Sequence, residues 1–304
     1  MYNELIPFLR DMAGDRVRVQ EPMKEHTSFR IGGPADVWFS PKTEEEIRLA
    51  YAKARELKVP VTVLGNGSNL VVSDLGIEGL VLQIGEDFSC VQVRENRIAA
   101  QSGAKLVAVC RKAQQAGLSG LEFAYGIPAC VGGAVTMDAG AYGGEMAQVT
   151  ACVRLMNGKG EFLTLTGEEM HFAYRHSRVM EEELIILGAE FALTQDDPAA
   201  ILSRMEDYNS RRREKQPLNY PSAGSVFKRP EGHFAGKLIE DAGLKGARVG
   251  DAQVSEKHAG FIVNLGHATA QDVMTLMDEV RRKVHDASGV MLEPELRLIG
   301  RREK

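Results

Sequence analysis

The stretch from Tyr125 to Glu145, YGIPACVGGAVTMDAGAYGGE, constrains the fold of this 304-residue chain more than any other segment. It holds six glycines, including two Gly-Gly pairs, and no charged residue before Asp138. Glycine adopts positive φ and lets other groups approach the main chain, but inside a helix or strand it costs about 0.5–1 kcal/mol relative to alanine. Successive bare N–H groups can form an anion-binding nest. The stretch therefore favours an irregular wall of backbone amides facing a flat or phosphorylated ligand over a long tight turn between core strands.

The composition narrows the class of protein. A formal net charge of −5 argues against a nucleic-acid binder, which usually carries a basic stripe. No apolar run reaches the roughly 18 residues of a membrane span, and the N-terminus lacks the apolar core of a secretory signal. The four cysteines include no CxxC pair, so neither a metal site nor a redox dithiol is expected. We expect a reduced, cytoplasmic protein.

Hydrophobic periodicity and turn signals predict a mixture of helices and strands. Expected helices cover residues 1–14, 104–116, 199–213 and 270–287, and a further helix follows the capping-box residues Thr43 and Glu46. Expected strands cover residues 59–64, 71–74, 79–84, 89–94, 97–101, 151–156, 161–165, 184–193 and 293–299, and residues 255–264 are expected to pass from loop into strand. Asn157-Gly158 predicts a hairpin between two of these strands. Because few helices separate the strands, the pattern favours an α+β fold over regular βαβ winding, with a domain boundary near Gln195.

The segment Gly65-Asn66-Gly67-Ser68-Asn69-Leu70 follows an expected strand, as a dinucleotide-binding turn would. The third glycine of that fingerprint is absent, because Leu70 stands there and more strand follows. No GxxxxGK[ST] phosphate loop exists either. Two interpretations remain open from the residues alone. The segment is either a loop that donates amides to a pyrophosphate or a plain hairpin.

Several charged or nucleophilic side chains occur near turn signals, and each also has an ordinary structural explanation. Arg30 precedes a Gly-Gly-Pro turn, and its guanidinium could donate two parallel hydrogen bonds to a phosphate or a carboxylate. Positive charge at residues 211–215 could collect an anionic substrate, or simply end a solvated helix. Arg175 and Ser225 carry no signal when taken singly. The histidines assemble into no triad and no metal-ligand spacing.

Seven motifs in order give a more specific indication. They are SFRIGGPAD (28–36), LGNGSNL (64–70), GIPACVGGAVTMDAGAYGGE (126–145), YRHS (174–177), PSAGSVFK (221–228), EKHAGF (256–261) and EPELRLIG (293–300). Together they resemble the UDP-N-acetylenolpyruvoylglucosamine reductase family over about residues 27–299. The resemblance implies a two-lobed FAD-binding domain of the PCMH type at 1–195, with lobes at about 1–85 and 86–195. An α+β substrate-binding domain at 196–304 would follow.

The same resemblance implies a set of site residues. Catalytic roles fall on Arg175, Ser225 and Glu295. Cofactor binding falls on Arg30, Gly65, Asn66, Gly67, Ser68, Asn69, Leu70, Gly126, Ile127, Pro128, Cys130, Val131, Gly133, Gly140, Tyr142 and Gly143. Substrate binding falls on Arg212, Lys228, Arg229, Lys257 and His258.

The implied chemistry is reduction of UDP-N-acetylglucosamine enolpyruvate to UDP-N-acetylmuramate for peptidoglycan, with non-covalent FAD and NADPH as co-substrate. Reduced flavin would pass hydride to the enolpyruvyl methylene, and Ser225 would protonate the adjacent carbon. Arg175 and Glu295 would stabilise the charge that develops on the substrate. We expect no metal, nucleic acid, membrane or obligate protein partner. The rival interpretations are another PCMH-type FAD oxidase or dehydrogenase, and a flavin- or nucleotide-binding sensor without turnover.

The chain also departs from the family pattern. Ala129-Cys130 replaces Gly-Ser or Gly-Thr, Asp138 replaces asparagine, and Arg229 replaces an asparagine after Lys228. A thiol is a much weaker hydrogen-bond donor than a hydroxyl, so one cofactor contact at Cys130 is affected. The short 174–193 segment resembles the subgroup without a large inserted lid.

Overall fold

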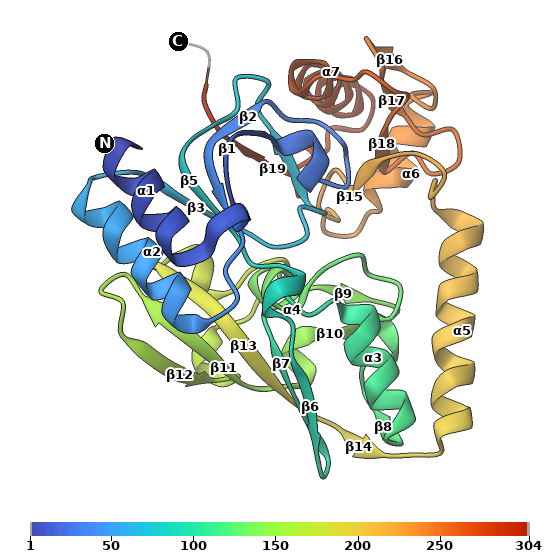
Figure 1. Ribbon diagram of the computed structural model, residues 1–304. Helices are drawn as coiled ribbons and strands as arrows, with labels where there is room; N and C mark the ends of the chain where they lie inside the picture. Colours follow the sequence, from blue (N-terminus) through green and yellow to red (C-terminus); the bar gives the residue numbers. More distant parts are fainter. Residues whose placement is uncertain (1, 303–304) are drawn as a thin grey trace. The chain divides into compact units, whose positions relative to one another are not determined.

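The computed structural model describes residues 2–302, which form an α+β protein (Figure 1). Its α-helices are α1 (Tyr2–Ala13), α2 (Glu44–Glu56), α3 (Leu106–Gln115), α4 (Val131–Thr136), α5 (Pro198–Lys215), α6 (Ala235–Asp241) and α7 (Ala270–Ser288). Contacts divide the chain into two compact units. Unit 1 holds the described residues up to Arg18, together with Val37–Asn66 and Gly79–Arg212. Unit 2 holds Val19–Asp36, Gly67–Glu78 and the described residues from Arg213 onward.

Side-chain caps set the starts of two helices, of which the sequence predicted the first. The Thr43 side chain accepts a hydrogen bond from the backbone N–H of Glu46 at 3.1 Å, as its sequence pattern predicts. Helix α7 begins with a full capping box, in which Thr269 and Asp272 bond each other's backbone N–H groups at 3.0 Å. It ends at Gly289, whose φ of 73° suits the left-handed conformation that commonly follows a helix.

The largest sheet of unit 1 is antiparallel and has the order β12-β11-β13-β7-β6. Its strands are β6 (Val91–Arg94), β7 (Arg97–Gln101), β11 (Thr150–Asn157), β12 (Phe162–Thr166) and β13 (Leu184–Ala192). The hairpin predicted at Asn157-Gly158 joins β11 to β12. Helices α3 and α4 share one buried core with this sheet, which includes Leu106, Val131 and Phe191. This core therefore anchors the glycine-rich segment through its buried residues Val131, Ala134 and Val135.

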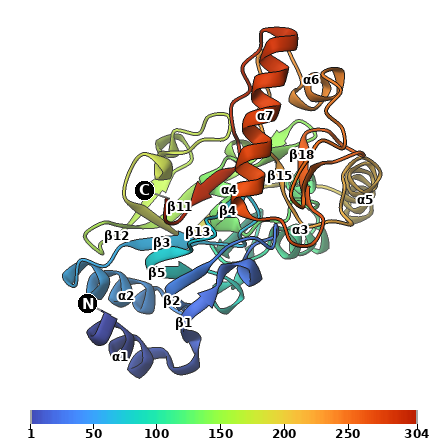
Figure 2. The same ribbon diagram turned by 90° about the horizontal axis from the view of Figure 1, so that it is seen from above.

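A second sheet has the order β1-β2-β5-β3. Its strands are β1 (Val17–Pro22), β2 (Pro34–Phe39), β3 (Val61–Leu64) and β5 (Ile77–Gln83). Strand β3 runs parallel to β5, so the chain leaves β3 toward the Gly65–Asn66 loop. Helices α1 and α2 lie side by side in unit 1, as Figure 2 shows, and their apolar faces share a core with Phe39 and Leu82.

Unit 2 contains the antiparallel sheet β15-β18-β17-β16, with α7 packed against β16, β17 and α6 (Figure 1). Its strands are β15 (Ser222–Ser225), β16 (Arg248–Val249), β17 (Ala252–Val254) and β18 (Phe261–Asn264). A separate parallel pair joins β4 (Leu70–Val72) to β19 (Arg297–Ile299). Two short pairs complete unit 1, namely β8 (Leu118–Ser119) with β14 (Thr194–Gln195) and β9 (Gly140–Ala141) with β10 (Gly144–Glu145).

The structure excludes one of the two open interpretations and corrects two local predictions. The hairpin interpretation of residues 59–74 fails, because β3 pairs with β5 whereas β4 pairs with β19. The glycine-rich stretch is not wholly irregular, because α4 forms at residues 131–136, where Val131, Ala134 and Val135 are buried. The closing strand is shorter than 293–299, since the chain at 293–295 instead contacts the segment around Phe227.

Between residues 2 and 302, no helix is long and apolar enough to cross a membrane. The same part of the chain holds no group of three or more histidine, cysteine, aspartate or glutamate side chains placed to bind a metal ion. All four cysteines are free thiols.

Candidate functional site

The predicted cofactor residues fall on both units. Those in unit 1 are Gly65, Asn66, Gly126, Ile127, Pro128, Cys130, Val131, Gly133, Gly140, Tyr142 and Gly143. Those in unit 2 are Arg30, Gly67, Ser68, Asn69 and Leu70. Among the predicted catalytic residues, Arg175 belongs to unit 1, whereas Ser225 and Glu295 belong to unit 2.

In unit 1, side-chain hydrogen bonds hold the Gly65–Asn66 loop against the glycine-rich stretch. The Asn66 amide donates to the carbonyl oxygen of Pro128 at 2.6 Å. The Gln83 amide nitrogen donates to the Gly65 carbonyl at 3.3 Å, and its oxygen accepts from the Trp38 indole at 2.7 Å. Two segments that the sequence assigned to one cofactor are therefore joined directly.

The glycines near this loop differ in which atoms an added Cβ would contact. A Cβ at Gly65 would lie 2.3 Å from the Cys130 sulfur, so the thiol already fills that space. A Cβ at Gly132 would lie 3.0 Å from the Cβ of Ser102, which is also tight. Apart from its chain neighbours and the backbone of its own helix, a Cβ at Gly133 would meet one atom of residues 2–302 within 4 Å, the Cys130 sulfur at 3.8 Å, and no left-handed φ demands glycine there. The packing of the described residues therefore does not require glycine at position 133 and leaves the backbone there open to a close approach.

Farther along the stretch, β9 and β10 form a hairpin whose two loop residues are Tyr142 and Gly143. Both have positive φ, 54° and 85°, as a type I′ turn requires. The Tyr142 ring stacks on Tyr208 of α5 with a centroid separation of 4.7 Å and an interplanar angle of 4°. The hairpin therefore presents an exposed aromatic face supported by a second ring.

Arg175 lies in a tight turn in which Ala173 and His176 exchange backbone hydrogen bonds. Its Nη1 donates to the carbonyl of Asp138 at 3.2 Å, and its Nη2 donates to the carbonyl of Gly140 at 3.3 Å. The guanidinium thus lies against the glycine-rich stretch. Both of these acceptors are neutral carbonyl oxygens.

Arg212 is half-buried at the end of α5, where Gly126 leaves room for its side chain. A Cβ on Gly126 would lie 3.0 Å from the Arg212 Cδ. Burial lowers the pKa of the Arg212 guanidinium, although the nearby Tyr142 acts in the opposite direction. Among residues 2–302 we find no hydrogen bond or ion pair from Arg212. A half-buried guanidinium without a carboxylate partner is suited to bind an anionic ligand.

In unit 2, the segment that carries Ser225 lies beside the segment that carries Glu295. The Glu295 backbone N–H donates to the Val226 carbonyl at 2.8 Å, and the Asn69 amide donates to the Glu295 carbonyl at 3.3 Å. Ser225 pairs with Phe261 across β15 and β18, next to the EKHAGF motif. Three motifs that are remote in sequence are therefore adjacent, and both Ser225 and Glu295 are half-buried.

Lys228 also belongs to this cluster. Its backbone N–H donates to the Glu293 carbonyl at 2.8 Å, and its ammonium lies 3.6 Å from the Glu293 carboxylate.

Arg30, in the first motif, is exposed and has a left-handed φ of 55°. Its neighbour Ser28 donates to the Ser222 carbonyl at 2.7 Å, which anchors the first motif to β15.

The remaining predicted substrate residues make mainly structural contacts. The Arg229 guanidinium lies 4.0 Å from the centroid of the exposed Phe234 ring. The Lys257 ammonium donates to the Arg213 carbonyl at 2.7 Å. The His258 Nδ1 accepts from the Gly260 backbone, and burial lowers the pKa of its imidazole.

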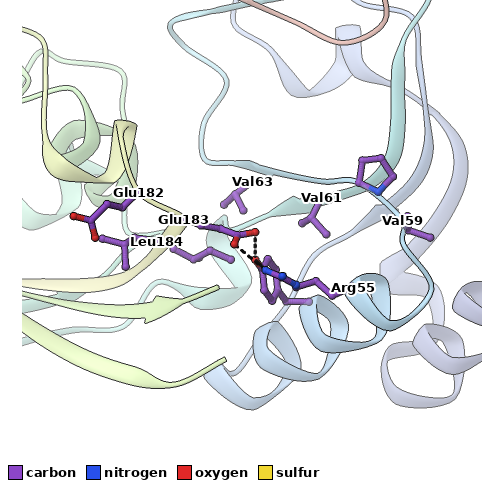
Figure 3. A pocket seen from close by; sticks show the side chains of 10 residues that line it. Arg55, Val59, Val61, Val63, Glu182, Glu183 and Leu184 are labelled. Atoms are coloured by element: carbon purple, nitrogen blue, oxygen red, sulfur yellow. Dashed lines mark hydrogen bonds and ion pairs between the residues drawn. The ribbon is translucent and has the colours of Figure 1, made fainter. Parts of the chain in front are cut away.

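A separate groove of about 270 Å³ lies in unit 1 over β3 and the start of β13 (Figure 3). Its lining includes the apolar side chains of Val61, Val63 and Leu184. Glu183, which also lines it, accepts hydrogen bonds from Tyr51 and Arg55. Because none of the seven motifs supplies a lining residue, we do not place the flavin site there.

Sequence reasoning missed the residues that hold the motifs in place. Gln83 and Trp38 fix the Gly65 loop, and Tyr208 supports Tyr142. Ser177 is fully buried and donates to the Thr136 carbonyl at 2.8 Å. Only Ser177 lies in a quoted motif. The others carry no local signal, since their partners are remote along the chain.

The chain matches two family models. Residues 35–166 match the FAD binding domain, and residues 216–299 match the C-terminal domain of UDP-N-acetylenolpyruvoylglucosamine reductase. A protein of that reductase name from Agathobacter rectalis is 52% identical over 292 residues, covering 92% of this chain and 93% of its own. Another, from Exiguobacterium sibiricum, is 49% identical and covers 95% of both chains.

Solved structures agree with the sequence matches. The crystal structure of UDP-N-acetylenolpyruvylglucosamine reductase from Thermus caldophilus has a TM-score of 0.79 and 38% identity, covering 93% of this chain and 99% of that one. A structure of alkyldihydroxyacetonephosphate synthase, with a TM-score of 0.50 and 16% identity, covers 64% of this chain and shares the fold alone.

Proposed function

The chain belongs to the UDP-N-acetylenolpyruvoylglucosamine reductase family, and from that premise we propose what its own residues do. The protein is an oxidoreductase, a UDP-N-acetylmuramate dehydrogenase, which reduces UDP-N-acetylglucosamine enolpyruvate with NADPH and FAD for peptidoglycan synthesis. The observation that carries this conclusion is the match to named reductases over more than nine tenths of both chains. We further propose that residues 1–195 bind FAD, that residues 196–304 bind the UDP-sugar, and that the enzyme is cytoplasmic without an obligate protein partner.

We propose that FAD is bound non-covalently along the glycine-rich stretch and the Gly65–Asn69 loop. FAD supplies the hydride chemistry when bound, and the protein supplies orientation and electrostatics. The open backbone at Gly133 supports this assignment, as does the hydrogen bond that joins Asn66 to Pro128. The exposed Tyr142 ring is proposed as an apolar wall for the ligand.

For the reaction, we propose that Ser225 is the general acid. It would donate a proton to the substrate carbon adjacent to the methylene carbon that receives the hydride. A serine hydroxyl is a poor acid in water, so its alkoxide needs a cationic neighbour. Lys228 lies three residues away on the same segment and is the candidate for that role. Its ion pair with Glu293 is long and half exposed, so the ammonium charge is only partly neutralised.

We assign Arg175 and Glu295 to the carboxylate of the enolpyruvyl group. Arg175 would donate two hydrogen bonds to that carboxylate and stabilise the negative charge that develops on it during the reaction. Glu295 would have to be protonated to donate a hydrogen bond to the same group. Arg212, Lys228, Arg229, Lys257 and His258 are proposed to contact the UDP-sugar, and Arg212 has the strongest support because of its burial without an acidic partner.

The visible spectrum of the purified protein tests the function. We expect flavin bands that bleach with anaerobic NADPH and return on addition of UDP-N-acetylglucosamine enolpyruvate. UDP-N-acetylglucosamine, which lacks the enolpyruvyl group, is the control and should leave the flavin reduced. Bleaching without return would favour another PCMH-type oxidase or dehydrogenase. A colourless protein that does not take up FAD would leave only a nucleotide-binding sensor.

A further inference from the structure

The position of the Arg175 guanidinium depends on the backbone of residues 138–140. Both of its hydrogen bonds to that segment go to carbonyl oxygens, those of Asp138 and Gly140. Arg175 itself has a φ of 58°, an uncommon conformation for a residue with a long side chain. A small rotation at Asp138 would therefore move the two acceptors that hold Arg175.

The Asp138 side chain adds one hydrogen bond to those by which the main chain itself holds this backbone. Asp138 is 2% exposed and has a φ of 41°, a left-handed conformation that aspartate, asparagine and glycine tolerate best. Its Oδ1 accepts a hydrogen bond from the backbone N–H of Ala147 at 2.8 Å. This hydrogen bond joins the two ends of the segment that contains the β9–β10 hairpin. Residues 138–147 therefore form a closed loop, and Arg175 donates hydrogen bonds to its first residues.

The charge of Asp138 is not required for this arrangement. Burial raises the pKa of its carboxyl, and the nearby Glu145 acts in the same direction, whereas the Ala147 N–H and the Arg175 guanidinium lower it. An asparagine at this position would keep the same oxygen acceptor and tolerate the same φ without the cost of a buried charge.

We propose that Asp138 is a positioning residue, which sets Arg175 in place to bind the enolpyruvyl carboxylate. It does so through its left-handed backbone and its Oδ1 acceptor, without touching the substrate. This inference rests on the proposed function, because the binding of the enolpyruvyl carboxylate by Arg175 is itself part of that proposal.

Three substitutions separate the parts of this inference. Asp138→Asn keeps the acceptor and tolerates the φ. Asp138→Gly keeps only the φ, and Asp138→Ala keeps neither. The control is Glu122→Gln, which removes the charge of another buried carboxyl in unit 1 that pairs with Arg204 instead.

The readout compares two ligands by calorimetry. UDP-N-acetylmuramate carries a carboxylate on its lactyl group, whereas UDP-N-acetylglucosamine does not. We expect Asp138→Ala to weaken binding of the first about tenfold or more and to leave the second unchanged. Asp138→Gly should lie in between, and Asp138→Asn and Glu122→Gln should match the wild type. In stopped flow, the same order should appear in flavin reoxidation by substrate, whereas flavin reduction by NADPH stays constant.

Each other result overturns the inference. Equal losses for both ligands in Asp138→Ala would mean a merely structural role. Asp138→Asn as weak as Asp138→Ala would mean that the charge acts directly, and wild-type behaviour of all three variants would mean that Asp138 does not position Arg175. A wild-type protein that does not prefer the carboxylate ligand would instead contradict the proposed function, so the two failures are distinguishable.

Discussion

Gly133 provides the sharpest test of the proposed flavin site. A side chain added there fits within the protein, whereas it would collide with a cofactor bound as we propose. Beyond its chain neighbours and its own helix backbone, the new Cβ of Gly133→Ala meets one atom of residues 2–302, the Cys130 sulfur, at an ordinary van der Waals distance of 3.8 Å. Replacing a helical glycine by alanine is worth about 0.5–1 kcal/mol. We therefore expect the apoprotein to become slightly more stable, by about 2–4 °C in Tm for each kcal/mol.

The bound cofactor should respond in the opposite direction. A methyl group on a backbone that the flavin approaches closely must displace the ligand or the loop. We expect at least a tenfold loss of FAD affinity, which corresponds to about 1.4 kcal/mol. The assay is titration of apoprotein with FAD by calorimetry, paired with thermal unfolding of the apoprotein.

Gly132→Ala is the matched control, since its Cβ would lie 3.0 Å from the Ser102 Cβ and 3.3 Å from the Ser102 carbonyl oxygen. This crowding should offset the helix gain, so the apoprotein should not gain the stability expected for Gly133→Ala. A folded Gly133→Ala protein that binds FAD as tightly as the wild type would refute the placement of the cofactor on this part of the stretch.

The remaining predictions concern catalysis, acid stability and capping. Ser225→Ala should slow flavin reoxidation by substrate about 10²–10⁴-fold without slowing reduction by NADPH, and unchanged reoxidation in stopped flow would remove Ser225 from the mechanism. Burial alone would raise the pKa of Glu122, but hydrogen bonds from Arg204 and from neighbouring backbone and serine groups lower it below its ordinary value of 4.5. A lowered pKa adds stability above pH 4.5 that is lost as pH falls through the folded-state value, so Glu122→Gln should cost about 1.5–3 kcal/mol in urea unfolding at pH 7 and less near pH 3. An equal cost at both pH values would contradict this. Thr269→Ala should lower the unfolding free energy by about 1 kcal/mol with an unchanged m-value, and no change in the urea midpoint would mean that the capping box with Asp272 contributes nothing.

Local patterns in the sequence predicted local structure well. The capping residue Thr43, the Asn157-Gly158 turn and the apolar face of α7 each depend on neighbours within a few residues, and the structure confirms all three. The α4 helix was missed because the glycines lower its intrinsic propensity. Burial of Val131 and Val135 against the sheet overrides that propensity.

The site was predictable only as a set of segments. The motifs name Arg175 and Ser225, but spacing along the chain does not reveal that the first is held by the carbonyl of Asp138. Nor does it reveal that the segment of the second pairs with Glu295, 70 residues onward, through the Val226 carbonyl. Such contacts depend on how sheets pair over long separations, and pairing of that kind leaves no periodic mark in either partner.

The pairing of β4 with β19 also has a consequence for how the protein is made. Every segment of unit 1 has been synthesised once the ribosome has passed Arg212. Unit 2 begins at Val19, yet β4 gains its parallel partner only after Arg297–Ile299 has been synthesised. Residues 67–78 must therefore wait through more than two hundred codons before their strand pairs. Unit 1 can therefore fold during translation before unit 2, which is completed only after β19 has been synthesised.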